Sequence, residues 1–122
     1  MANFIYYNVN PSGVRENDCV TRAITLATGL PYKKIAQKLY LSAKLLECDK
    51  LNFFCYSHLL DDVFKFQRVP TYNMTVNEFA NIHPYGTYLI RMNGHISVLK
   101  NGTVYDIWDC RREIVTDAWL VR

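Results

Sequence analysis

Two Asn-Gly dipeptides constrain the fold of this chain more than any other feature of its sequence. They stand at 93–94 and 101–102. They separate three short runs rich in β-branched and aromatic residues: 86–92, 95–100 and 103–108. Asn-Gly is the strongest short-range signal for a β-hairpin, because both central residues of that two-residue turn need positive φ. The sequence therefore predicts an antiparallel meander, to which residues 113–121 add a further strand.

Helical patterns precede this meander. Residues 17–29 open with Asn17 and Asp18, both good N-cap residues, and space their apolar side chains three and four apart up to Gly29. Further helices are expected over three segments: 30–47, 57–66 and 75–83. Residues 4–9 have the composition of a short strand. The layout predicts an α+β fold in which N-terminal helices pack on a C-terminal antiparallel β-sheet.

The length of 122 residues predicts one domain spanning residues 1–122. Half of the residues are hydrophobic and 20% are charged, so the chain can bury a core without metals or disulfides. The net charge of +3 comes from scattered basic residues, unlike the basic face of a nucleic-acid-binding protein. No apolar run approaches a membrane span, and the first residues lack a secretory signal. We therefore expect a cytoplasmic protein with neither a nucleic-acid partner nor a membrane partner.

The four cysteines are Cys19, Cys48, Cys55 and Cys110, and a cytoplasmic location predicts that they are free thiols. The last three, together with His58, invite a zinc interpretation. Their spacing lacks the paired two-residue knuckles of structural zinc sites. We therefore expect no metal and no cofactor.

Cys19 is the candidate nucleophile of the chain. It sits in the first turn of the helix expected over 17–29, where backbone amides and aligned peptide dipoles lower the pKa of a thiol. A thiolate nucleophile needs a base that also acts as an acid near neutral pH, which means histidine. His58 falls in an expected helix and His83 precedes a proline. His95 begins a strand beside a hairpin turn, where a rigid element can hold it, so it is the favoured partner.

Hairpin register suggests the group that orients His95. If 101–102 is a two-residue turn, His95 stands opposite Trp108 and Asp106 lies on the same face as a diagonal neighbour of His95. Asp109 points to the other face as long as the strand continues, and reaches the histidine only if the strand ends at Trp108. Asp106 is the favoured orienting carboxylate, and Asp109 is the alternative.

Two stretches, "NDCVTRAI" at 17–24 and "GHISVLKNGTVYDIWD" at 94–109, resemble the papain-like cysteine peptidase superfamily in its compact bacterial and phage forms. The step from His95 to Asp106 is similar to that of NlpC-type cell-wall endopeptidases, and an Asp-Cys pair also occurs there and in bacteriocin-processing peptidases. The resemblance implies a papain-like fold in which the nucleophile opens the central helix. It also implies a Cys19, His95, Asp106 triad that cleaves an amide or isopeptide bond through an acyl-enzyme.

The chain departs from the papain pattern in its oxyanion donor. Papain-type enzymes place a glutamine before the nucleophile, and no glutamine precedes Cys19. Asn17 is the candidate side-chain donor in its place. A peptide or protein is the expected substrate, and an acyltransferase would use the same residues. The alternative from another class is a non-catalytic binding or inhibitor module, for instance one encoded by a phage, on a papain-like scaffold. The sequence leaves the oligomeric state open.

Overall fold

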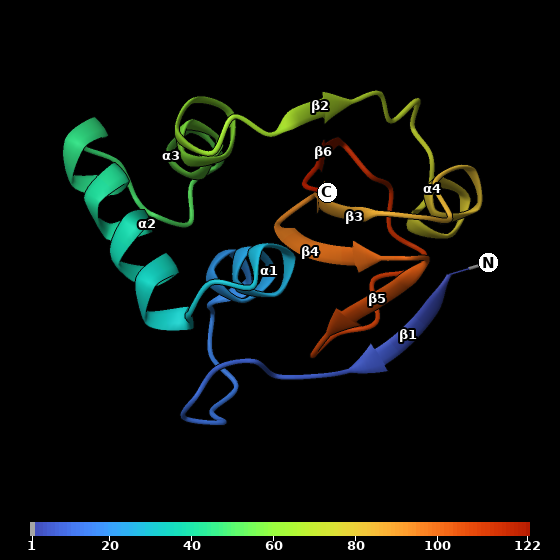
Figure 1. Cartoon of the computed structure of the whole chain (residues 1–122), viewed down its shortest axis with the longest axis horizontal. Coiled ribbons are helices and arrows are strands. Elements are labelled where there is room, and N and C mark those ends of the chain that lie inside the picture. The colour runs from blue at the N-terminus through green and yellow to red at the C-terminus, as the bar shows by residue number, and fades with distance from the viewer. Residues whose placement is uncertain (1) are drawn as a thin grey trace.

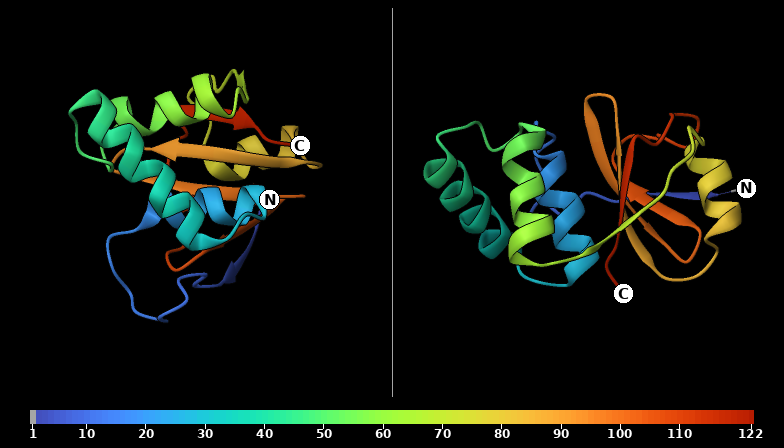
Figure 2. Two further views of the ribbon diagram at one scale, coloured as in Figure 1. Left: turned by 60° about the vertical axis from the view of Figure 1, so that its left-hand side comes forward. Right: turned by 90° about the horizontal axis from the view of Figure 1, so that it is seen from above.

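The computed structural model describes residues 2–122 and shows one mixed β-sheet with helices on both faces (Figures 1 and 2). The elements in chain order are β1 (Asn3–Tyr6), α1 (Cys19–Thr28), α2 (Tyr32–Leu46), α3 (Phe53–His58), the π-helical turn η1 (Leu59–Val63), β2 (Gln67–Val69), α4 (Val76–Ile82), β3 (Thr87–Met92), β4 (His95–Lys100), β5 (Thr103–Asp106) and β6 (Asp117–Leu120). Within residues 2–122, every helix is too short or too polar to cross a bilayer.

The sheet has the strand order β1-β5-β4-β3-β6-β2. Its centre is the antiparallel meander β3-β4-β5 that the two Asn-Gly turns predict. Lys100 pairs with Thr103 and Met92 pairs with His95, so each turn contains two residues. Asn101 and Gly102 both have positive φ, as this turn type requires, whereas of the other turn only Gly94 does. The two tight turns fix the register that brings the end of β5 beside the start of β4.

Helices cover the two faces of the sheet unequally. On one face, α1, α2 and α3 enclose a core that includes Ile24, Ile96 and Trp119, all fully buried. On the other face, α4 packs Phe79 onto a second core with strand residues such as Leu99. The view from above in Figure 2 shows α4 on the side of the sheet opposite to α1, α2 and α3.

This architecture confirms the α+β class and a mostly antiparallel sheet, but the predicted arrangement was wrong in three respects. Two strands, β1 and β2, come from before the meander, and β1 pairs parallel with β5. In addition, α4 lies on the opposite face from the other helices. Strand β1 overlaps the strand expected over residues 4–9, but its parallel pairing with β5 was not expected. Strand β2 is a short edge strand with mostly exposed residues, so it carries almost none of the alternating pattern by which a strand is recognised.

Two element boundaries and one helix cap differ from the sequence prediction. The third helix begins at Phe53 because Asn52 caps it, accepting a hydrogen bond from the Phe54 amide at 2.8 Å. Strand β5 ends at Asp106, two residues before Trp108. Asp18 stands at the N-cap position of α1 but its side chain does not cap the helix, since it binds another partner described below.

Cys48 and Cys55 form a disulfide that ties the end of α2 to α3, with their Cα atoms 6.0 Å apart. The expectation of four free thiols is therefore wrong for this pair, while Cys19 and Cys110 are free. Cys48 lies just after the end of α2 and Cys55 lies within α3, and the sequence alone gave no reason to join them. The disulfide fixes the conformation of the loop from 49 to 52.

Replacing Cys48 with Ala should lower the free energy of unfolding by about 2 kcal/mol, because the disulfide closes a short loop and restricts the unfolded chain. Chemical denaturation without reductant measures the loss. With excess reductant, the wild type and the variant should unfold at nearly the same denaturant concentration. Equal stability of the two proteins without reductant would contradict the pairing.

Candidate active site

Cys19 and His95 meet at the end of the sheet where β4 begins. Cys19 is the first residue of α1 and His95 is the first residue of β4. Helix α1 packs along β4, which holds the two side chains beside each other. Both line a cavity of about 160 Å³. Its other lining residues are Asn17, Val20, Leu51, Phe53, Tyr56, Arg91, Gly94 and Ile96.

Asp106 orients the imidazole of His95. Its Oδ2 lies 2.7 Å from Nε2 of His95, and the carboxylate is only 2% exposed. Asp109 instead binds Arg111, at 2.8 Å, and does not reach the histidine. The choice between the two carboxylates depends on the end of β5: Asp106 still alternates onto the face of His95, and the chain turns outward directly after it.

Nδ1 is the nitrogen of His95 left to face Cys19, because Asp106 occupies Nε2. Burial raises the pKa of the Cys19 thiol, but the hydrogen bond and charge of His95, the Ile96 amide and the charge of Arg22 outweigh it and lower that pKa. Burial opposes the charged form of His95, yet Asp106 and Cys19 together raise its pKa to about 9. These opposite shifts favour a thiolate–imidazolium pair.

The carboxylate of Asp106 is held ionised in a nearly dry site. Burial works against its charge, but hydrogen bonds from His95 and other donors lower its pKa to about 2. The Ile107 amide donates to Oδ1 at 2.7 Å, and Nη1 of Arg22 donates to the same oxygen at 2.8 Å. A fixed negative charge at this place holds the imidazole in one orientation and favours its protonated form.

Arg22 is a site residue that sequence reasoning missed. Its side chain is 6% exposed and bridges two carboxylates, with Nε 2.7 Å from Asp18 and Nη1 2.8 Å from Asp106. Asp18 is satisfied further by the hydroxyl of Tyr32 at 2.7 Å and the amide of Asn10 at 3.1 Å. The available signal was the four-residue spacing of Asp18 and Arg22 in the turn that carries the nucleophile.

Tyr56 is a second missed residue, and it forms the wall opposite the helix start. It is 4% exposed. Burial raises the pKa of its hydroxyl to about 12, against the opposing effect of Arg91 and with a contribution from the charge of Cys19. A guanidinium only donates, so the contact with Arg91 leaves the tyrosine proton available for the cavity. No pattern in the sequence linked this helix to Cys19.

Arg91 and Phe53 form the outer part of the same wall. The guanidinium of Arg91 lies 3.9 Å from the centre of the Phe53 ring and pairs with Asp117 at 2.7 Å. Asn17, the sequence-predicted oxyanion donor, also lines the cavity but is exposed. Both candidate donors, Asn17 and Tyr56, therefore stand at the cavity that holds the thiol.

The other two histidines have structural partners. His58 pairs with Asp62 on the surface, at 3.0 Å. His83 packs on Phe79, with ring centres 4.3 Å apart. Neither histidine lines the Cys19 cavity.

The residues of the zinc interpretation do not assemble into one site. Cys48 and Cys55 are joined to each other. Cys110 lies instead beside His95 and Asp106, with one potential ligand atom from each of the three within 4.8 Å of the others. Burial raises the pKa of the Cys110 thiol to about 12, so it is protonated and a poor ligand. This trio is better explained as part of the hydrogen-bonded support of His95.

Comparison of the chain with known protein families, curated proteins and solved structures gave no match.

Replacing Arg22 with Met should lower the free energy of unfolding by about 3 to 5 kcal/mol, because two buried carboxylates lose their shared cation. Replacing Arg68 with Met removes a half-exposed arginine that also bridges two carboxylates, Asp61 and Asp117, and should cost only about 1 kcal/mol. Urea denaturation of both variants gives the comparison. Similar losses of unfolding free energy for the two variants would show that the burial of Arg22 and its two carboxylates does not increase their contribution to stability.

Proposed function

We propose that the protein is a cysteine hydrolase that cleaves an amide or isopeptide bond. One observation carries the proposal: a thiol with a lowered pKa opens a helix beside a histidine whose other nitrogen is bound by a buried carboxylate. A surface cysteine or a cysteine in mid-helix would lack the helix start, the adjacent histidine and the carboxylate that orients it.

The proposed reaction has two steps. The Cys19 sulfur forms a bond to the substrate carbonyl carbon, and the carbon–nitrogen bond breaks as His95 passes its proton to the leaving amine. Water then attacks the thioester, giving a proton to His95, and the carbon–sulfur bond breaks to release a carboxylic acid and the Cys19 thiolate, which restores the thiolate–imidazolium pair. Asp106 keeps the ring oriented throughout, and Arg22 keeps Asp106 in place. An amine in place of water would make the same site an acyltransferase.

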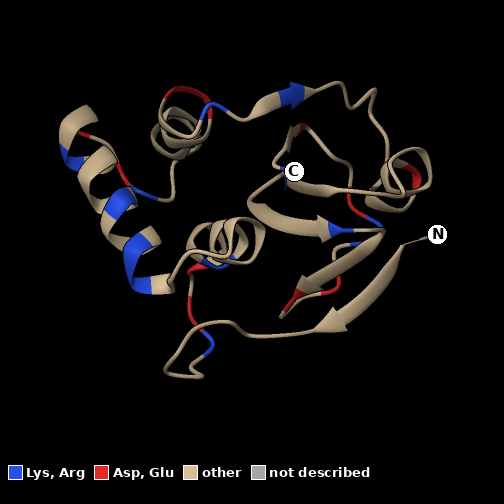
Figure 3. Ribbon diagram, viewed as in Figure 1, with Lys and Arg blue, Asp and Glu red and all other residues tan. Residues whose placement is uncertain are grey.

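A papain-like scaffold is part of this proposal. In support, the nucleophile opens a helix packed on the sheet, the histidine begins a strand of that sheet, and the carboxylate ends the adjacent strand. The proposal includes a single domain over residues 1–122 in a compact form similar to bacterial and phage enzymes. The lysines spread along α2 and the remaining charges scattered over other helices, loops and strands (Figure 3) support a peptide or protein substrate over a nucleic acid.

A cytoplasmic location stays a prediction. Disulfides persist mainly in oxidising compartments, so a Cys48–Cys55 bond that persists in cells would argue against a cytoplasmic location. Trapping the thiols in intact cells with an alkylating reagent, before lysis, would report whether this pair is reduced where the protein works.

Tyr56 is the proposed side-chain oxyanion donor, in place of the glutamine of papain-type enzymes. Its hydroxyl keeps its proton at neutral pH, and the residue lines the cavity that holds Cys19. The Cys19 amide at the helix start supplies the second donor. Asn17 is the alternative, since it borders the same cavity, but its exposed side chain is less well fixed.

Native Cys19 should react with iodoacetamide at pH 6.5 faster than the same cysteine in the urea-denatured chain, because its pKa is lowered only in the folded state. Peptide mass mapping follows the site of labelling. His95→Ala should remove this advantage. Equal rates in the native and denatured chains would count against an activated thiol.

Cys19→Ala and His95→Ala should each reduce cleavage of fluorogenic peptide or isopeptide substrates by about 10⁴-fold or more, because parts of one catalytic unit fail together. Asp106→Asn should lose less and alter the pH profile. If Cys19→Ala keeps the full biological effect of the wild type, the cavity serves binding and the inhibitor-module hypothesis replaces the hydrolase.

Tyr56→Phe should lower kcat by about 10² to 10³-fold while iodoacetamide labelling of Cys19 stays at the wild-type rate, because alkylation develops no oxyanion. The change removes one oxygen and keeps the ring packing. Asn17→Ala is the matched comparison and should have a small effect. The reverse pattern would assign the donor to Asn17.

A further inference from the structure

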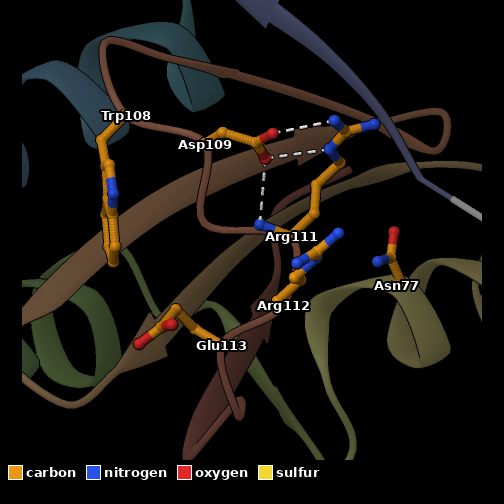
Figure 4. Close-up of a pocket in the computed structure, with 6 residues that line it drawn as sticks. All are labelled: Asn77, Trp108, Asp109, Arg111, Arg112 and Glu113. Carbon is orange, nitrogen blue, oxygen red and sulfur yellow. Dashed lines mark hydrogen bonds and ion pairs between the residues drawn. The ribbon is translucent and has the colours of Figure 1, made fainter.

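A second cavity, of about 450 Å³, lies beside the catalytic residues and takes no part in the reaction described so far. Figure 4 shows its walls. They consist of Asn77 from α4 and of five residues from the segment that follows β5: Trp108, Asp109, Arg111, Arg112 and Glu113. This cavity is larger than the one that holds Cys19, so it has room for a substantial part of a substrate.

Trp108 joins this cavity to the catalytic residues. Its ring lies edge-on to the ring of His95, with centres 5.0 Å apart, and it is 44% exposed. The wall segment also begins directly after Asp106, the residue that orients the histidine. A ligand in the cavity would therefore lie against the same tryptophan that contacts the catalytic imidazole.

The position of His95 tells which part of a substrate would reach this cavity. In the proposed reaction the imidazole gives its proton to the leaving amine, so the amine side of the scissile bond lies toward His95. Beyond His95 on this side stands Trp108. The assignment of the cavity to the amine side rests on the proposed function.

Arg111 is already engaged, whereas Arg112 is not. Arg111 binds Asp109 through Nη2 at 2.8 Å and Nε at 2.9 Å, and it donates to the Ala2 carbonyl at 3.1 Å. Within residues 2–122, Arg112 has no hydrogen bond or ion pair and adds only a longer-range attraction to Asp109. In Figure 4 its guanidinium points toward Asn77, while Glu113 points away from it.

Asn77 adds a donor beside Arg112. Its Oδ1 accepts a hydrogen bond from the Ala2 amide at 3.0 Å, which fixes the side chain and leaves its NH₂ group for the cavity. The cavity thus offers an unpaired guanidinium, an amide donor and an indole surface. A guanidinium fork matches the two oxygens of a carboxylate.

We propose that this cavity is a specificity site for the amine side of the substrate and selects a carboxylate there. Arg112 binds the carboxylate, Asn77 donates a further hydrogen bond, and the aliphatic part of the same residue packs on Trp108. The carboxylate comes either from an acidic side chain or from a free C-terminus, and the experiment below separates these two sources.

Binding to the Cys19→Ala protein tests the site without cleavage. The probes are three dipeptides: glycyl-glutamic acid amide (side-chain carboxylate), glycyl-glutamine (terminal carboxylate) and glycyl-glutamine amide (no carboxylate). At low ionic strength, at least one carboxylate probe should bind roughly fivefold more tightly than the neutral one, as fits a partly exposed ion pair. Calorimetry measures the affinities, and fluorescence of the exposed Trp108 reports the place of binding.

Arg112→Ala, made in the Cys19→Ala protein, should abolish the preference for a carboxylate. Arg122→Ala is the matched control, because the register of β3 with β4 and β6 places Arg122 at the sheet end opposite His95, and this variant should keep the preference. Equal affinities for all three probes, or a preference that survives in Arg112→Ala, would overturn the inference.

Cleavage assays separate this inference from the proposed function. Substrates in which the residue after the scissile bond carries a carboxylate, either as a glutamic acid amide or as glutamine with a free C-terminus, are compared with the glutamine amide substrate. The carboxylate source that binds more tightly should raise kcat/KM by roughly fivefold in the wild type and have no effect in Arg112→Ala. Cleavage without any charge preference would overturn the specificity site and leave the hydrolase standing. An inert Cys19 in a protein that still binds the carboxylate probes through Arg112 would overturn the hydrolase and leave the carboxylate site.

Discussion

The buried guanidinium of Arg22 is the interaction on which the geometry of the site depends. It joins Asp18 at the start of α1 to Asp106 at the end of β5, with hydrogen bonds of 2.7 and 2.8 Å. A buried charge that loses its partner costs several kcal/mol, as is typical of broken buried ion pairs. Moving the start of α1 away from the end of β5 would therefore destabilise the fold. Cys19 follows Asp18 in the chain and His95 binds Asp106. The same bridge therefore sets the position of Cys19, the proposed nucleophile, relative to His95, its proposed base.

Charge alternates along this bridge: Asp18 is negative, Arg22 positive, Asp106 negative and His95 positive, and the series ends at the Cys19 thiolate. Each neighbour stabilises the next, which explains why burial does not neutralise the site. The contribution of His95 to stability is present below its usual pKa of 6.5 and is lost as pH rises through about 9. That of Asp106 is present above its usual 3.8 and is lost as pH falls toward about 2. Both contributions are fully present between the usual pKa values of 3.8 and 6.5, so the site is most stable in that pH range.

What the sequence could predict was decided by the range of each interaction. The two Asn-Gly turns act over a few residues, and they sufficed to place Asp106 beside His95. The position of Asp109 depends instead on the end of β5 at Asp106 and on its ion pair with Arg111. The helix start at Cys19 was equally local. Long-range contacts gave no such signal: the parallel pairing of β1 with β5 and the approach of Tyr56 to the thiol join segments distant in sequence. The Cys48–Cys55 disulfide has a sequence separation of only 7, but no sequence pattern marked it. Arg22 stood between these cases, since its spacing from Asp18 was visible but its reach to Asp106 was not.

The walls of the two cavities are fixed by different means, and this bears on how a substrate would be held. On one side, the disulfide anchors the loop that carries Leu51 and Phe53. On the other, the Asp109–Arg111 ion pair and the bond of Arg111 to the Ala2 carbonyl hold the segment after β5. Preformed walls spare a substrate the entropic cost of ordering loops when it binds. The exposed Trp108 lines one cavity and contacts His95 of the other, so in the proposed reaction a substrate chain would contact rigid surfaces on both sides of its scissile bond.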